Sequence, residues 1–210
     1  MEVEFVAAAA ASVFAIVDPI GILPFFTALT EPFTPQDREI ILRRSIAVLA
    51  SVLTLFAIAG RFLFAGFGFT LAAFEIAGGI LLFWVAFEML NGEITRTRLA
   101  AGEQADALAQ RDEIAVVPLG IPLLAGPGAI STVMIYIGSA GSNPLDIVGV
   151  FVAIAITTIA SYVILRYGQG ILRLLGRLGT LAIARVLGLL LAAVAVQFVL
   201  NGILAVAPQL

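Results

Sequence analysis

The stretch Val17-Asp18-Pro19-Ile20-Gly21-Ile22-Leu23-Pro24 interrupts a hydrophobic segment that is long enough to cross a bilayer. A second interruption, Ala125-Gly126-Pro127-Gly128-Ala129, lies in another such segment. A membrane helix that gives up backbone hydrogen bonds must find new partners for the freed groups, because lipid offers none. In secondary transporters, broken helices of this kind form the substrate site. The sequence therefore predicts a binding site at the two breaks.

The prolines explain why each segment should break. Pro19 has no N–H, so the carbonyl of Ala15 loses its helical partner, and Pro127 does the same to the carbonyl of Leu123. Glycines beside both prolines permit an unwound backbone. A single cluster of this kind would fit a kinked but continuous helix. Two clusters at matching places favour two broken helices.

Composition places the chain among proteins that cross the membrane several times. Of its 210 residues, 61% are hydrophobic and 12% are charged, and the mean hydropathy is +1.13. The absence of cysteine and histidine excludes disulfides, thiolate metal sites and histidine-based catalytic triads. We expect no metal and no cofactor. A pI near 4.9 without a basic face argues against nucleic-acid binding.

Six apolar stretches predict six transmembrane helices in a single all-α membrane domain that covers residues 1–210. Each stretch reaches the roughly 20 residues that a spanning helix needs. The expected spans are Val3–Leu29, Ile40–Gly60, Gly68–Leu90, Glu113–Ile137, Leu145–Leu165 and Leu181–Ala207.

Arginines fix the expected orientation. They crowd the first, third and fifth connections, whereas the second connection has only Arg61 and the fourth has none. Cytoplasmic loops carry the excess of positive charge. We therefore expect a protein of the inner (cytoplasmic) membrane with both termini outside. The arginines of the odd connections are Arg38, Arg43, Arg44, Arg96, Arg98, Arg111, Arg166, Arg173 and Arg177.

The chain also resembles itself. Residues 74–92 align without gaps on residues 184–202, with shared glycines at Gly78 and Gly188, and both segments end in Asn-Gly. Because each half holds three spans, the second half enters the membrane from the opposite side. The sequence thus predicts two inverted repeats, 1–92 and 113–210, joined by a polar cytoplasmic linker, 91–112. The first and fourth helices would be broken at mid-membrane.

A broken helix offers two kinds of binding group. The half-helix that begins after a break presents free N–H groups and a positive dipole end, which suit a carboxylate. The half-helix that ends before it presents bare carbonyls, which suit an ammonium group or a cation. Two facing breaks can therefore hold a small zwitterion. The predicted binding residues are Asp18, Pro19, Gly21, Thr27, Gly126, Pro127, Gly128, Ala129, Ser131 and Thr132.

Asp18 carries the main charge at this depth, and an intramembrane carboxylate is a functional candidate by default. It would accept from a substrate ammonium group, coordinate a sodium ion or carry a coupling proton. The structural alternative is an N-cap for the half-helix that starts at Pro19. Thr27, Ser131 and Thr132 would add hydroxyl contacts, or else bond back to the preceding turn.

Three segments resemble the MarC family of integral membrane proteins, which includes the archaeal SnatA-type neutral amino-acid transporters. These are the stretch from Asp18 to Pro24, the Pro/Gly block 118–129 and residues 195–202. The resemblance implies six spans, inverted repeats, external termini and transport of amino acids such as glycine and alanine. Family members tend to carry a basic residue where this chain has Glu75.

The leading hypothesis is a secondary transporter of small neutral amino acids that is driven by protons or sodium. We expect no enzymatic activity, and the protein could form homo-oligomers. An exporter of amino acids or other small amphiphiles is the nearest alternative, because the sequence does not reveal direction. An intramembrane enzyme is the alternative of a different class. It would have only Asp18, Ser131 and Thr132 as catalytic material.

Overall fold

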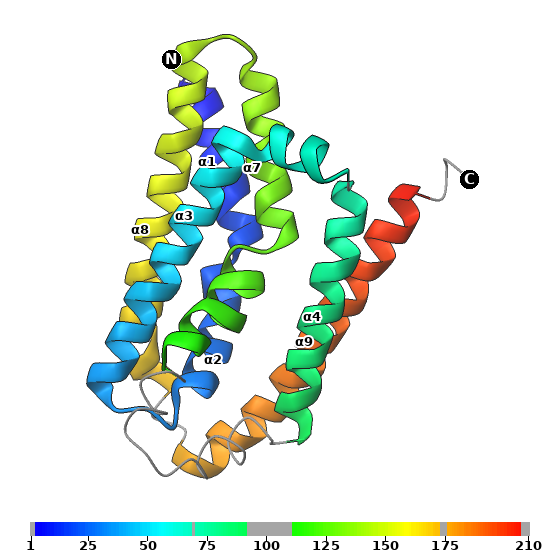
Figure 1. Cartoon of the computed structure of the whole chain (residues 1–210). Helices are drawn as coiled ribbons and strands as arrows, with labels where there is room; N and C mark the ends of the chain where they lie inside the picture. The colour runs from blue at the N-terminus through cyan, green and yellow to red at the C-terminus, as the bar shows by residue number, and fades with distance from the viewer. Residues whose placement is uncertain (1–2, 69, 92–110, 173–175, 207–210) are drawn as a thin grey trace.

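The computed structural model describes residues 3–68, 70–91, 111–172 and 176–206, and the regular secondary structure of these residues is entirely helical. Figure 1 shows long helices that lie side by side. The elements are α1 (Val3–Val17), α2 (Pro19–Thr30), α3 (Pro35–Phe67), α4 (Leu71–Asn91), the irregular helix η1 (Ala115–Leu124), α7 (Pro127–Ala140), α8 (Pro144–Leu172) and α9 (Gly176–Val206).

Four helical segments are long and apolar enough to cross a membrane. They are Val3–Thr30, Pro35–Phe67, Pro144–Gly168 and Gly188–Val206. The bent pair Arg111–Leu124 and Pro127–Ala140 makes a fifth when it is counted as one span. The third predicted span corresponds to the shorter apolar helix Leu71–Phe87. All six predicted segments are thus helical, and four or five of them meet the criteria for a span.

Most of the predicted linker 91–112 lies outside the described residues, which include only Asn91, Arg111 and Asp112 of it. Arg96, Arg98, Arg173 and the side chain of Arg177 also lie outside them, as does the last residue of the sixth predicted span, Ala207.

Local sequence explains where the helices begin. A proline occupies the first turn of α2, α3, α7 and α8, where its missing N–H costs no helical bond. Thr34 caps α3 by accepting from the amide of Asp37 at 3.2 Å. At the other end, α3 stops at Gly68, whose positive φ of 71° only glycine adopts readily.

The two interrupted helices differ in how strongly they are broken. Between α1 and α2 only Asp18 leaves the helical conformation, with a φ of 44° and a ψ of 61°, and Val3–Thr30 still forms one span. Between η1 and α7 the chain bends by 57°. Within η1, Val117 and Ile121 are extended because each precedes a proline. Three prolines in one segment therefore bend the second helix far more than the first.

The helices form two groups (Figure 1). In one group, α1, α2, α3, η1, α7 and α8 share a large buried apolar core. In the other, α4 and α9 pack along each other and form a smaller core around Leu82, Ala86 and Leu191. Large apolar side chains such as Phe62, which is 80% exposed, cover the outside. A surface of this kind is suited to lipid.

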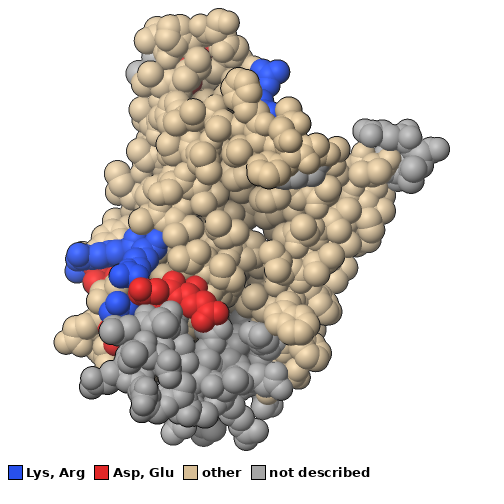
Figure 2. All heavy atoms as spheres, viewed as in Figure 1, with Lys and Arg blue, Asp and Glu red and all other residues tan. Residues whose placement is uncertain are grey.

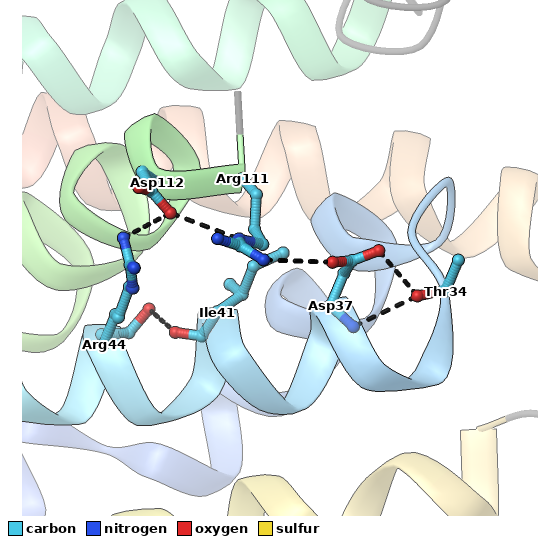
Figure 3. A network of polar contacts seen from close by, with 7 residues as sticks. Thr34, Asp37, Ile41, Arg44, Arg111 and Asp112 are labelled. Carbon is cyan, nitrogen blue, oxygen red and sulfur yellow. Dashed lines mark hydrogen bonds and ion pairs between the residues drawn. The ribbon is translucent and has the colours of Figure 1, made fainter. Parts of the chain in front are cut away.

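Charged side chains gather at one end of the molecule, around the first turns of α3 (Figure 2). Arg111 contacts Asp37 on α3 at 3.4 Å and its neighbour Asp112 at 3.3 Å, and Asp112 also pairs with Arg44 (Figure 3). This network ties α3 to the segment that leads into η1. Nearby, Glu39 accepts from Arg43, Tyr162 and Arg166, which links α3 to α8.

Glycines allow α4 and α9 to approach closely. A Cβ added at Gly79 would lie 2.7 Å from the Ala195 carbonyl oxygen, and one added at Gly202 would lie 2.7 Å from that of Ala72. These distances are below van der Waals contact. The pair can therefore pack only with glycine at both positions.

We predict that Gly79→Ala and Gly202→Ala each destabilise the protein by about 1–3 kcal/mol, because the added methyl groups force the two backbones apart. The matched control is Gly66→Ala in α3, where an added Cβ meets nothing within 4 Å. That change should be neutral or slightly stabilising. Thermal unfolding in detergent measures all three variants, and equal effects at the three sites would contradict the close packing.

Candidate functional site

A cavity of about 600 Å³ lies where the two helix breaks meet the α4–α9 pair. Its volume is within the range of small-molecule sites, about 300–1,000 Å³. One wall comes from the first break and α2, a second from η1 and α7, and a third from α4 and α9. The lining residues are Ile16, Val17, Asp18, Gly21, Ile22, Pro24, Phe25, Leu82, Pro122, Leu123, Gly126, Gly128, Ala129, Leu190, Leu191, Ala193, Val194 and Phe198.

Asp18 is the single ionisable side chain among these lining residues. Its left-handed backbone places the carboxylate over the start of α2, where Oδ1 accepts from the amide of Gly21 at 3.0 Å. Aspartate tolerates this conformation better than most residues, because its short polar side chain bonds locally. Asp18 is solvent-accessible, and Oδ1 alone takes part in the cap. The predicted capping role is confirmed.

Gly21 is required by this arrangement. A Cβ at position 21 would lie 2.1 Å from Oδ2 of Asp18, so any side chain there would displace the carboxylate. Gly21 is therefore needed to accommodate the carboxylate of Asp18, in addition to the backbone flexibility that it gives.

The second break presents backbone instead of a side chain. Gly126 precedes α7 without any side-chain cap, and its carbonyl accepts from Ile130 at 3.1 Å. Pro127 has no N–H, so the amides of Gly128 and Ala129 are the first donors of α7, and both residues line the cavity. The N-terminus of a helix attracts anions. The cavity therefore has an anionic group on one wall and an anion-binding helix end on another.

The two breaks lie beside each other. A Cβ added at Gly128 would lie 3.1 Å from the side chain of Ile16, and both residues line the cavity. Segments that are far apart in the sequence therefore build one site, as the matching positions of the two clusters predict.

Half of the predicted binding residues line this cavity. Asp18, Gly21, Gly126, Gly128 and Ala129 do so. Pro19 is buried beside it, and Pro127 packs against Gly78 of α4, where an added Cβ would lie 2.5 Å from Cγ of the proline.

The three predicted hydroxyls are engaged by their own helices. Thr27 donates to the Leu23 carbonyl at 2.9 Å, Ser131 to that of Pro127 at 2.7 Å, and Thr132 to that of Gly128 at 2.8 Å. None of the three is among the described lining residues. Their role in binding stays a prediction.

The third wall was not predicted. Leu82 on α4 and Leu190, Leu191, Ala193, Val194 and Phe198 on α9 are apolar residues in apolar helices, so their types carry no functional signal. The only sequence feature that pointed to them is the similarity of residues 74–92 and 184–202, which lie largely in α4 and α9.

Comparison with known proteins gives one consistent result. The sequence profile of the MarC family integral membrane proteins matches residues 3–207. A UPF0056 membrane protein of Pyrococcus abyssi is 40% identical over 191 residues, which are 90% of each chain. The Escherichia coli UPF0056 membrane protein YhcE is 34% identical over 197 residues, 94% of this chain and 91% of its own. The Bacillus subtilis protein YvbG is 32% identical over 200 residues, 95% and 94%. No solved structure matches the chain.

The capping geometry makes a prediction about stability. Asp18→Asn should leave the thermal unfolding midpoint nearly unchanged, because asparagine caps helices as well as aspartate and accepts a left-handed backbone. Asp18→Ala should lower the free energy of unfolding by about 1 kcal/mol or more. Alanine has no side-chain acceptor for the Gly21 amide, and its Cβ disfavours a positive φ. Both variants are measured by thermal unfolding in detergent. If asparagine destabilised as much as alanine, the cap would not be the structural role of Asp18.

Proposed function

The chain belongs to the MarC family of integral membrane proteins, and from this premise and the cavity we propose that it is a secondary transporter of small neutral amino acids. The observation that carries the proposal is the pairing of Asp18 with the uncapped start of α7 across one cavity. The ammonium group of an amino acid would pair with the carboxylate of Asp18, and the carboxylate of the amino acid would accept from the amides of Gly128 and Ala129.

The rest of the cavity favours a neutral side chain. Every other lining residue is glycine, proline or an apolar residue, so a charged side chain would lose its hydration without compensation. The volume of the cavity is larger than that of a glycine or alanine molecule. This is expected of an open state that narrows around the substrate when the access side changes.

The helix contacts support two related halves, as the proposed inverted repeats require. Exchanging α1 with η1, α2 with α7, α3 with α8 and α4 with α9 turns the first half of the chain into the second. Under this exchange the contact α1–α8 corresponds to α3–η1, α2–α8 to α3–α7, and α2–α9 to α4–α7, and all six occur. The contacts α3–α8 and α4–α9 correspond to themselves. Among the closer contacts of the described residues, only α7–α8 and α4–η1 lack a counterpart.

The charge distribution supports the predicted orientation in the cytoplasmic membrane. Arg38, Arg43, Arg44, Arg111 and Arg166 all interact around the first turns of α3. The positive-inside tendency makes this the cytoplasmic end. The start of α1 and the end of α9 lie toward the opposite end (Figure 1), in keeping with our proposal that both termini are outside.

An intramembrane enzyme is less well supported. Among the described lining residues, Asp18 is the one side chain capable of acid–base chemistry, and no hydroxyl nucleophile accompanies it. A channel is disfavoured because those residues include no ring of charges. An exporter remains compatible with the same cavity, since a binding site of this kind does not define direction.

We predict that the purified protein, reconstituted in liposomes, takes up radiolabelled alanine, and that Asp18→Asn lowers its apparent affinity roughly 10–100-fold. This loss corresponds to one charge-assisted hydrogen bond, about 1.5–3 kcal/mol. Asparagine keeps the helix cap, so the variant should still fold. Glu4→Gln, a neutralised carboxylate in the first turn of α1, serves as the matched control and should leave uptake unchanged.

Absence of alanine and glycine transport by the wild type, under imposed proton and sodium gradients tested separately, would refute the proposal. Normal uptake by Asp18→Asn would remove Asp18 from the substrate site. Counterflow in both directions, in vesicles of known orientation, separates an importer from an exporter.

A further inference from the structure

Two hydroxyl groups in the middle of α8 are fully buried and have no hydrogen-bond partner. Thr157 and Ser161 are both 0% exposed, and neither Oγ1 of the threonine nor Oγ of the serine makes a hydrogen bond. The neighbouring Thr158 behaves in the ordinary way, donating to the Ile154 carbonyl at 2.7 Å. A buried polar atom without a partner is uncommon and calls for an explanation such as a bound water or ion.

The two hydroxyls lie on the buried side of α8, which packs against α1, α2 and α3. They belong to one buried stripe of the helix, whose other members are Val150, Ile154 and Leu165. Two close approaches flank this stripe: a Cβ at Gly149 would lie 2.8 Å from Val6, and one at Gly168 would lie 2.4 Å from Leu23. The helices therefore run in the same direction, side by side.

These two contacts set the register between the helices. Interpolating between them places Thr157 level with Val13 and Ser161 level with Ile16 and Val17, the last turn of α1. Val13 and Val17 lie on the same face of α1 as Val6 and are almost fully buried. The partnerless hydroxyls thus lie at the depth of the first helix break.

The end of α1 offers what a cation needs. In a continuous helix the amide of Gly21 would bond the Val17 carbonyl, but here it donates to Asp18 instead. The last turn of α1 has no basic residue to offset the negative end of the helix dipole. The carboxylate of Asp18 adds negative charge directly beyond it. Val17 also lines the cavity, which gives an ion a route in.

We propose that the Val17 carbonyl and the hydroxyls of Thr157 and Ser161 form a sodium site beside the substrate cavity. The inference deepens the proposed transport function and rests on it, because bound sodium would be the coupling ion. Backbone carbonyls at the C-terminal end of a half-helix coordinate sodium in other secondary transporters, and hydroxyl oxygens are ligands of the same neutral kind. Mg²⁺ and Ca²⁺ generally require carboxylates, and the described residues include no cluster of potential metal-binding acids. Water is disfavoured relative to a cation by the negative helix end.

Sodium binding can be tested without any amino acid. In detergent, replacing choline chloride with sodium chloride should raise the thermal unfolding midpoint of the wild type, because sodium binds only the folded state, and potassium chloride should raise it much less. In Thr157→Val/Ser161→Ala the rise should disappear, reflecting sodium affinity weakened about tenfold or more.

Thr158→Val provides the matched control, since its hydroxyl is already satisfied within α8, and should keep the sodium response. Folding of the double variant is not in question, because replacing partnerless buried hydroxyls with apolar groups is neutral or stabilising. In choline chloride it should unfold at or above the wild-type temperature. A fall in choline chloride would show that the hydroxyls have structural partners, and would overturn the site.

A wild type that does not respond to sodium, or a double variant that responds fully, would also overturn the site. Alanine uptake is measured on the same preparations, so the two proposals fail separately. Uptake without a sodium response refutes the sodium site alone, whereas a sodium response without uptake of any neutral amino acid refutes the proposed transport function and leaves the cation site standing.

Discussion

The structure depends on one constraint: inside lipid, every backbone polar group must find its partner within the protein. Prolines at positions 19 and 127 each remove a donor and leave a carbonyl of the preceding turn unpaired. At the first break, Asp18 supplies a cap and confines the interruption to one residue. At the second, three prolines bend the chain by 57°. The cavity forms where both sets of freed groups come together.

The rest of the fold supplies the remaining walls of that cavity. The glycines of α4 and α9 let this pair pack tightly enough to act as a single wall. One ion pair joins α3 to α8, and a network of ion pairs joins α3 to the segment that leads into η1 (Figure 3). These pairs are partly exposed and individually weak. Such contacts can be broken and remade, as the proposed alternating access would require.

Several features of the site follow from residue type alone. A carboxylate in an apolar segment is energetically costly in lipid, which made Asp18 a functional candidate. An aspartate directly before a proline is also a common helix N-cap, so its capping role could be predicted. The hydroxyls of Thr27, Ser131 and Thr132 could not be placed in this way, because a helical threonine or serine can bond its own turn or reach outward. The partnerless state of Thr157 and Ser161 had no signal in the sequence either, since it depends on what surrounds α8.

The sequence by itself determined the membrane class, the helical segments, the places where two of them break and the single charge at the first break. Those properties depend on hydropathy, on the missing N–H of proline and on the cost of charge in lipid, all of which are local. Only the tertiary structure decided which faces meet: that Gly128 lies against Ile16, that Pro127 fits against Gly78, and that α4 and α9 close the cavity with apolar side chains. Apolar helices look alike along the chain, and only the shapes of their packed faces select the partners.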